Sequence, residues 1–251
     1  LSEYFQPHFK PDFNPDLLCA NNYICHLVVV RRQLAQSLGG MRREFDGAQD
    51  HDFLLRVSEK TDRIAHIPRV LYHWRIHRAS TADNPASKRY AYDAGVRAVK
   101  EHLERLGLAC QVEQTADMGF YRVSYPVKGE PLVSVIIPNK DEKDTLKACL
   151  DSIKEKSTYR NYEILIIENN SETPEIFDYY REIDGKDGIR VLYWKEEFNY
   201  SRLNNFGIAH ARGDYLICLN NDISVITPDW IERMLGYCQR PGTGIVGARL
   251  Y

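Results

Sequence analysis

Three polar residues, Asn220, Asn221 and Asp222, directly follow the apolar run 215–219, which reads as a buried strand. A carboxylate and an amide oxygen at a strand end are hard ligands, of the kind that hold Mg²⁺ or Mn²⁺ against a substrate diphosphate. The same triplet is also ordinary turn chemistry, because Asn and Asp favour turns. Segments 138–141 (PNKD) and 168–171 (ENNS) end two further apolar runs, so we expect all these polar groups at one edge of a sheet.

A second acidic cluster, residues 49–52 (QDHD), lies where a helix is expected to begin. Asp50 or Asp52 could simply cap that helix or favour its dipole. A carboxylate on a rigid helix start is equally suited to act as general base for a hydroxyl nucleophile, and Asp50 is the candidate. In the segment 72–77 (YHWRIH), His77 is a candidate contact to ligand or metal, although lone histidines are usually structural.

The second half of the chain alternates short apolar runs with amphipathic segments. Strands are expected at 133–137, 162–167, 189–193 and 215–219, and helices at 145–154, 174–181 and 201–211. This alternation predicts an α/β fold with a parallel sheet in three layers, whose ligands bind at the carboxyl ends of the strands.

The first half does not repeat this pattern. Strands are expected at 22–30, 64–68 and 70–74, and helices at 31–38, 50–59 and 87–106. The stretch 108–131 reads as irregular or hairpin-like because of its Gly and Pro residues, and we interpret it as a linker. The expected divisions are therefore 1–107, 108–131 and 132–251.

Composition excludes several classes of protein. The 251 residues are 43% hydrophobic and 27% charged, as in a water-soluble globular protein. A formal charge of -2 gives no basic field for nucleic-acid phosphates. No apolar run approaches the ~20 residues of a membrane span. The six cysteines form no C-x-x-C pair, which fits a reducing cytoplasm.

Absent motifs narrow the class further. No Cys or His spacing indicates a structural zinc site, and neither a P-loop nor a dinucleotide-binding glycine motif follows any expected strand. A P-loop ATPase and a dinucleotide oxidoreductase are therefore excluded. The sequence begins at Leu1, without Met or a signal peptide, so we expect an excised piece of a longer protein.

The motifs of the second half, taken together, resemble a known family. VSVIIPNKD (133–141), IIENNS (166–171), FNYSRLNNFG (198–207) and GDYLICLNND (213–222) are similar, in this order, to the nucleotide-binding half of family 2 inverting glycosyltransferases of the GT-A fold. Segments of the first half, FDGAQDHDFLLR (45–56), HIPRVLYHWR (66–75) and His77, resemble the acceptor half of the same family. Tandem-domain bacterial enzymes that build O-antigen, rhamnan or capsule chains show both.

The resemblance implies a role for each matching residue. Pro138, Asn139 and Asp141 would lie beside the nucleotide, and Glu168, where the family usually has Asp, would meet the base or ribose. Asn205 and Gly207 would line the diphosphate side. Asn220 and Asp222 would be the metal positions, with His77 as a further contact, and Asp50 would be the catalytic base. The departures from the family motifs are Glu168, Asn220 in place of Asp, and Gln49 in place of Glu.

The implied reaction is metal-assisted direct displacement on a nucleotide-diphosphate sugar, with Mg²⁺ or Mn²⁺ and either a UDP-sugar or a dTDP-sugar as donor. The implied acceptor is a glycan or lipid-linked glycan of a cell-surface polysaccharide, in the cytoplasm at the inner face of the membrane, with peripheral membrane association through the parent protein. Two alternatives remain: a catalytically silent fragment that acts as a binding or scaffold module, and a sugar nucleotidyltransferase. The latter normally carries a Gly-rich loop, and 138–142 (PNKDE) has no glycine.

The order of the halves is reversed relative to the family, in which the nucleotide half comes first. We interpret the chain as the end of one transferase domain followed by the start of the next. We expect the halves to combine in a composite domain, either as a circular permutation within one chain or in a swapped homodimer, with Asp50 facing Asp222 across one cleft.

Overall fold

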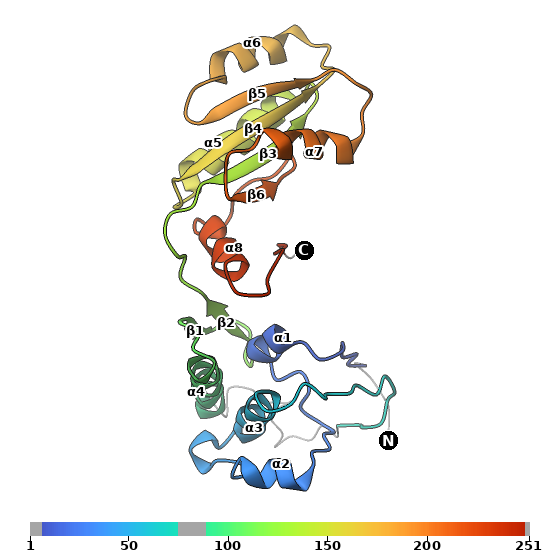
Figure 1. Cartoon of the computed structure of the whole chain (residues 1–251), viewed down its shortest axis with the longest axis vertical. Helices are drawn as coiled ribbons and strands as arrows, with labels where there is room; N and C mark the ends of the chain where they lie inside the picture. Colours follow the sequence, from blue (N-terminus) through green and yellow to red (C-terminus); the bar gives the residue numbers. More distant parts are fainter. Residues whose placement is uncertain (1–6, 75–88, 249–251) are drawn as a thin grey trace. The chain divides into compact units, whose positions relative to one another are not determined.

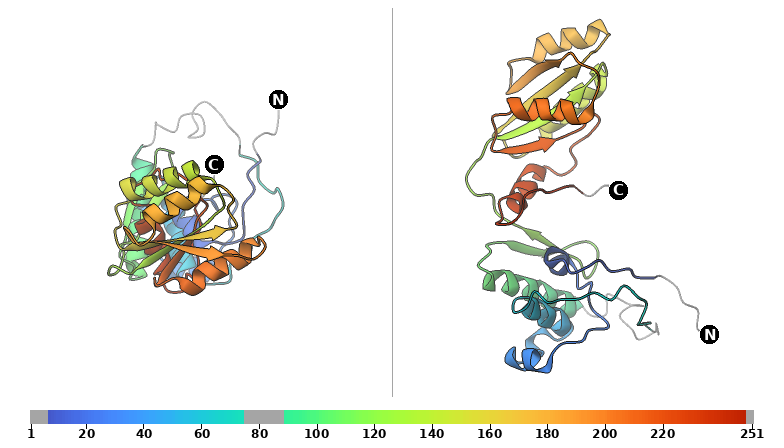
Figure 2. Two further views of the ribbon diagram at one scale, coloured as in Figure 1. Left: turned by 90° about the horizontal axis from the view of Figure 1, so that it is seen from above. Right: turned by 45° about the vertical axis from the view of Figure 1, so that its right-hand side comes forward.

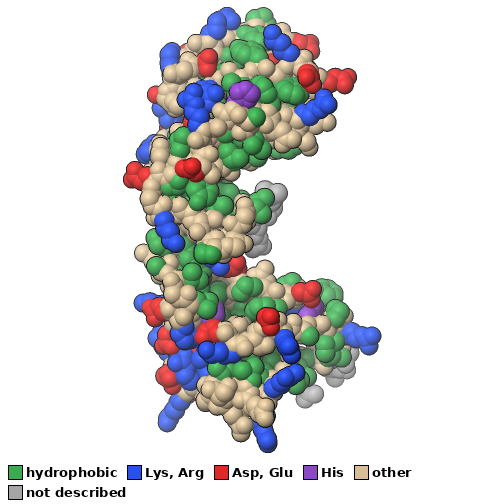
Figure 3. All heavy atoms as spheres, viewed as in Figure 1, with side chains coloured by type: hydrophobic (Ala, Val, Ile, Leu, Met, Phe, Trp, Pro, Cys, Tyr) green, Lys and Arg blue, Asp and Glu red, His purple; other side chains and the backbone are tan. Residues whose placement is uncertain are grey.

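The computed structural model describes residues 7–74 and 89–248. The chain divides into two compact units, Leu1–Tyr125 (unit 1) and Pro126–Tyr251 (unit 2), each of which is described here by itself. On the face drawn in Figure 3, acidic and basic side chains are interspersed over both units, in keeping with the net charge of -2.

Unit 2 is built on a four-stranded sheet in the order β5-β4-β3-β6, in which every neighbouring pair is parallel (Figure 1). Its elements, in chain order, are β3 (Val133–Asn139), α5 (Lys143–Lys156), β4 (Tyr162–Asn169), α6 (Pro174–Ile183), β5 (Ile189–Trp194), α7 (Tyr200–His210), β6 (Tyr215–Cys218) and α8 (Trp230–Cys238). The four expected strands and three expected helices are confirmed, and α8 was not anticipated.

Helices cover the sheet of unit 2 on both faces (Figure 2). On one face, alternate residues of β3 and β4 pack against α5, α6 and α8 in a cluster that contains Val135, Ile137, Ile166, Leu146, Ile176 and Ile231. On the other face, a smaller cluster joins Ile136, Leu165 and Ile167 to Leu203 of α7. Because strands buried on both faces read as continuous apolar runs, the sequence predicted this three-layer α/β architecture correctly.

Two helix starts in unit 2 follow simple local rules. The Asn199 side chain caps α7 by accepting a hydrogen bond from the Arg202 backbone N–H at 3.0 Å. Pro174 occupies the first turn of α6, where its missing N–H would have had no intrahelical partner. These signals fix where each helix leaves the carboxyl edge of the sheet.

Unit 1 is mainly helical with one antiparallel hairpin. Its elements are α1 (Pro15–Ala20), α2 (Arg32–Ser37), the 3₁₀ turn η1 (Arg43–Phe45), α3 (Gln49–Ser58), α4 (Arg89–Arg105), β1 (Gln111–Gln114) and β2 (Tyr121–Ser124). Helices α3 and α4 pack on each other, and the fully buried side chains include Leu18, Phe45, Leu55 and Val99. The helices expected at 31–38 and 50–59 are confirmed, and so is the described part of the one at 87–106.

Three strands expected in unit 1 are wrong. Residues 22–30, 64–68 and 70–74 form no strand, and the nearest ladder contact is an isolated bridge between Asn21 and Phe120. Leu27 is 69% exposed and Val29 is 93% exposed, so the apolar residues that suggested a strand are not in the core. A strand needs a paired neighbour and a buried face, and these segments have neither within the described part of the unit.

The expected linker is also placed differently by the structure. Residues 111–124 form β1 and β2, which belong to unit 1 because β1 contacts α4 and β2 contacts α1. The division between the units falls at Tyr125 and Pro126 instead of spanning 108–131. Gly119 and the polar residues around it make the hairpin loop.

Candidate functional site

The carboxyl ends of β3 and β6 are joined by a side-chain hydrogen bond. Asn221, in the turn after β6, donates its Nδ2 to Oδ1 of Asn139, the last residue of β3, at 2.7 Å. These two residues are 82 positions apart in the chain. The expectation that polar groups after separate strands gather at one sheet edge is thus met by a direct contact.

Asn139 itself is buried. It is 3% exposed, and its Nδ2 donates to Oη of Tyr180 on α6 at 2.7 Å and to the carbonyl oxygen of Asp141 at 3.2 Å. Burial, and then the charge of Glu168, raise the pKa of the Tyr180 hydroxyl. Asn139 was expected beside the nucleotide, but its side chain is directed toward the protein interior, where it bonds to both Tyr180 and Asn221.

Glu168, at the end of β4, has a similarly enclosed carboxylate. It is 2% exposed, and its two oxygens accept hydrogen bonds from the backbone N–H of Ser171 at 2.6 Å and from the Ser171 hydroxyl at 2.5 Å. The Ser171 Oγ in turn accepts from the backbone N–H of Asp141 at 2.8 Å. Glu168 therefore ties the loop after β4 to the loop after β3.

Asp141 occupies a left-handed backbone conformation, with φ of 56°. Its Oδ1 accepts from the N–H of Thr173 at 2.9 Å, the N–H of Glu172 at 2.7 Å and the Thr173 hydroxyl at 3.0 Å. These bonds, the Thr173 N–H first, lower the pKa of Asp141, because each stabilises the ionised form. Asp141 and Pro138 are both half-buried and lie at the carboxyl edge of the sheet, where the sequence predicted them.

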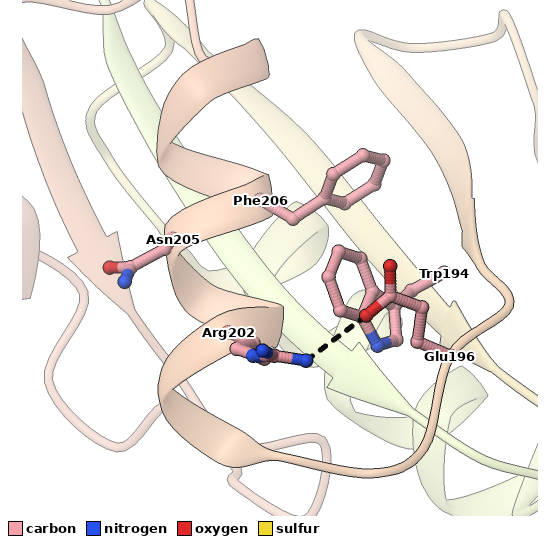
Figure 4. A pocket seen from close by; sticks show the side chains of 5 residues that line it. All are labelled: Trp194, Glu196, Arg202, Asn205 and Phe206. Atoms are coloured by element: carbon pink, nitrogen blue, oxygen red, sulfur yellow. Dashed lines mark hydrogen bonds and ion pairs between the residues drawn. The ribbon is translucent and has the colours of Figure 1, made fainter.

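A shallow pocket opens beside the start of α7, with a volume of about 390 Å³. Figure 4 shows its lining residues, Trp194, Glu196, Arg202, Asn205 and Phe206, with Arg202 paired to Glu196 at 3.1 Å. The pocket adjoins the end of β4, because Asn169 and Asn170 both donate to the Glu196 carbonyl oxygen. Asn205, expected to line a ligand site, is exposed here.

Gly207 has a different environment from Asn205. It is buried, and a Cβ placed on it would lie 2.5 Å from Cγ2 of Ile136 and 3.3 Å from Cδ1 of Ile167. Its lack of a side chain lets α7 approach the sheet closely. In the structure Gly207 lies on the side of α7 that packs against the sheet, whereas the resemblance assigned it to the diphosphate side.

Asn220 and Asp222 are both exposed in the turn after β6. One carboxylate and one amide oxygen fit Mg²⁺ or Mn²⁺ of the kind that takes its remaining ligands from water and substrate phosphates. In the ranges 7–74 and 89–248, no group of three or more His, Cys, Asp and Glu side chains could hold a metal by itself. A metal here would need a diphosphate to complete its coordination.

In unit 1, Asp50 lies in the first turn of α3, half-buried, and its Oδ2 accepts a hydrogen bond from Nδ2 of Asn22 at 3.0 Å. Asp52 is 0% exposed and is held by Arg42 and Arg56, with its shortest contacts at 2.5 Å and 2.7 Å. Burial would raise the pKa of Asp52, but the hydrogen bonds from Arg42 and Arg56 outweigh it and lower that pKa. Of the two carboxylates, Asp52 is the one that pairs with arginine side chains. His77 lies outside the described residues.

The second half of the chain matches the family described as "Glycosyl transferase family 2" over residues 134–251. We call residues 134–251, which resemble this family, the family 2 segment. This family 2 segment contains the whole carboxyl edge described above, from Asn139 to Asp222. A mannosyltransferase of Pyrobaculum calidifontis, solved in complex with GDP-Man and Mn²⁺, is similar with a TM-score of 0.42 and 20% identity over 47% of this chain and 35% of that one.

Two relatives match nearly the whole chain. "O-antigen biosynthesis protein RfbC" of Myxococcus xanthus is 43% identical over 245 residues, which is 97% of this chain and 19% of that protein. "Uncharacterized protein y4gI" of Sinorhizobium fredii is 43% identical over 248 residues, 97% of this chain and 27% of that protein. The chain thus spans about a quarter or less of these relatives, and they share its order of unit 1 before the family 2 segment.

Sequence reasoning missed three residues that join the edge together: Ser171, Tyr180 and Asn221. Tyr180 was included in an expected helix, and the other two were included in motifs without a role. The alternation of β3 was a usable signal, because Asn139 shares its face with the apolar Ile137 and must point toward α5 and α6.

Across the described residues, no helix is long and apolar enough to cross a membrane.

Proposed function

We propose that unit 2 binds the donor of an inverting glycosyltransferase, a nucleotide-diphosphate sugar, at the carboxyl edge of its sheet. The observation that carries this proposal is the bond between Asn221 and Asn139, which brings the Asp222 turn against the end of β3 within a family 2 segment. Ligands of open α/β sheets bind at such edges. A UDP-sugar and a dTDP-sugar are both compatible donors.

Asp222 and Asn220 would hold Mg²⁺ or Mn²⁺ together with the donor diphosphate, and this ion would neutralise the charge that develops on the leaving diphosphate. The exposed Asn205 lies on the helix that starts beside the same edge and would contact the diphosphate or sugar. Pro138 and Asp141 would flank the nucleotide, whereas the buried Asn139 and Glu168 would support the loops beneath it.

Asp50 would serve as the general base on the acceptor side. Its carboxylate takes the proton of an acceptor hydroxyl, whose oxygen bonds to the anomeric carbon while the bond from that carbon to the diphosphate breaks. Attack from the face opposite the leaving group inverts the configuration at that carbon. Positioned base catalysis contributes ~10²–10⁴-fold to such a step.

The larger relatives suggest where the reaction belongs. Because one of them is named for O-antigen biosynthesis, we propose that the parent protein extends a cell-surface polysaccharide on a glycan or lipid-linked glycan, at the inner face of the membrane. Units 1 and 2 would be the acceptor half of one transferase domain and the donor half of the next. Light scattering and small-angle X-ray scattering of the chain would distinguish a composite monomer, a swapped dimer and two independent units.

Calorimetry tests the donor site directly. UDP and dTDP are titrated into the chain with Mn²⁺ or with a chelator, and at least one should bind more tightly with the metal. Asp222→Ala should abolish this difference, whereas Asp178→Ala, which removes an exposed carboxylate from the middle of α6, should preserve it. Equal affinity with and without metal would contradict the metal assignment, and no binding of either nucleotide would contradict the donor site.

A further inference from the structure

We infer that Asn221, the middle residue of the Asn220-Asn221-Asp222 turn, is the positioning residue that sets the metal-binding side chains relative to the rest of the donor site. The metal-binding role of the turn rests on the proposed function, whereas the positioning by Asn221 rests on the hydrogen bonds of the turn. Asn221 is half-buried between two exposed neighbours, so its side chain is the one directed toward the protein.

The hydrogen-bond partner of the Asn221 side chain distinguishes this role from that of an ordinary turn residue. An Asn that merely forms a turn bonds to its own backbone about two residues on. Asn221 instead donates across the sheet edge to Oδ1 of Asn139, at 2.7 Å and 82 positions away. The Cys149 thiol makes a weak contact with the Asn220 carbonyl oxygen at 3.9 Å, and just before the turn the Leu219 backbone N–H donates to the Ile136 carbonyl oxygen of β3 at 2.9 Å.

Asn139 is well suited to receive this bond. Its Nδ2 faces the carbonyl oxygen of Asp141, which can only accept, so its Oδ1 is the atom left for Asn221. The same Nδ2 also bonds Oη of Tyr180, whose side chain is 1% exposed. An amide supplies the acceptor and the donor that these neighbours require, and neither Asp nor Leu could supply both.

Through Asn139 the turn is connected to the loops that follow β3 and β4. The Asp141 backbone N–H donates to Ser171 Oγ, and Ser171 donates to the buried Glu168, so the loops after β3 and β4 are hydrogen-bonded to each other. The Asn221 side chain connects the turn after β6 to these hydrogen-bonded loops. Without it, Asp222 and Asn220 would keep their chemistry but lose their fixed distance from the nucleotide loops, which is the property that binding a shared metal demands.

Two measurements on the full chain test the inference, with Asn221→Ala as the variant. The control is Asn161→Ala, which removes an exposed amide that donates to the Glu130 carbonyl oxygen, near the amino end of the sheet. Hydrogen exchange should speed up in the turn 219–224 of Asn221→Ala and not elsewhere in the sheet. The gain in UDP or dTDP affinity produced by Mn²⁺ should fall by ~5- to 10-fold, the worth of one hydrogen bond, while affinity in chelator stays unchanged.

The outcomes separate this inference from the proposed function. If Asn221→Ala exchanges like the unaltered chain, Asn221 does not fix the turn and the inference is wrong. If the turn loosens but the Mn²⁺-dependent gain is unchanged, Asn221 does not position the metal ligands, which also overturns it. If the unaltered chain binds a nucleotide but gains nothing from Mn²⁺, the proposed metal assignment fails and the assignment of Asn221 to metal positioning falls with it, whatever the exchange experiment shows about the turn.

Discussion

Asp50 and Asp52 stand two positions apart on α3 and have opposite environments. Asp52 is 0% exposed and accepts hydrogen bonds from Arg42 and Arg56, whereas Asp50 is half-buried and accepts from the neutral amide of Asn22. Positions i and i+2 of a helix point to different sides, so the helix itself separates the two carboxylates. Sequence spacing alone could not say which of them was structural.

Replacing Asp50 should therefore impair catalysis without unfolding the protein. In the proposed parent enzyme, Asp50→Asn is expected to lower turnover at least ~10²-fold and to leave nucleotide-sugar affinity nearly unchanged, because the proposed base would act only on the acceptor proton. Asp46→Asn, an exposed carboxylate just before α3, is the matched control. Steady-state kinetics with donor and acceptor varied separately would check this, and retained turnover would assign the base to a residue other than Asp50.

Replacing Asp52 should instead destabilise unit 1. Asp52→Ala leaves Arg42 and the buried Arg56 without their shared carboxylate, and losing one partner of a buried ion pair costs ~3–5 kcal/mol. Asp62→Ala, at an exposed position, should cost little. Urea unfolding followed by circular dichroism measures both. If Asp52→Ala lowered the free energy of unfolding by less than about 1 kcal/mol, this ion pair would stabilise the protein no more than an exposed pair does.

The same carboxylate predicts how stability depends on pH. The pKa of Asp52 in the folded state lies below its ordinary value of 3.8, because the hydrogen bonds from Arg42 and Arg56 outweigh the effect of burial. Its contribution to stability is therefore present above pH 3.8 and is lost as the pH falls through the folded-state pKa. Urea midpoints should fall steeply below about pH 4 in the unaltered chain and less steeply in Asp52→Ala. Parallel pH profiles for the two proteins would contradict this.

The fold of unit 2 was predictable because its two central strands, β3 and β4, are buried on both faces and read as unbroken apolar runs. The strand predictions in unit 1 failed because apolar residues there are exposed and unpaired in a sheet within the described residues. Leu27 and Val29 looked like strand residues, yet they are exposed, and nothing in their spacing reports whether a partner strand exists. At the site, the sequence located the polar edge but assigned ligand contacts to Asn139 and Glu168, whose side chains are turned inward.

The enclosed carboxylate of Glu168 makes Ser171 important for stability. Ser171→Ala removes the hydroxyl that donates to Glu168 Oε2, and an unsatisfied buried acceptor costs ~1–3 kcal/mol, more when charged. Ser171→Thr keeps the hydroxyl and should recover most of the loss. Denaturant unfolding of the two variants checks this, and equal stability of Ser171→Ala and the unaltered chain would show that water replaces the hydroxyl.

Gly207 offers a test of packing that is independent of any ligand. A methyl group at this position would lie 2.5 Å from Cγ2 of Ile136, closer than side-chain carbon atoms can approach, so α7 would have to move away from the sheet. In an exposed helix interior, Gly→Ala stabilises by ~0.5–1 kcal/mol, whereas overpacking a core costs ~1–3 kcal/mol. The contact with Ile136 therefore decides the sign, and Gly207→Ala should be destabilising. Ser201→Ala, at an exposed position of the same helix, should be nearly neutral. If thermal unfolding showed Gly207→Ala to be more stable than the unaltered chain, α7 would not lie as close to β3 as described here, and Gly207 would be free to face a ligand as its motif suggested.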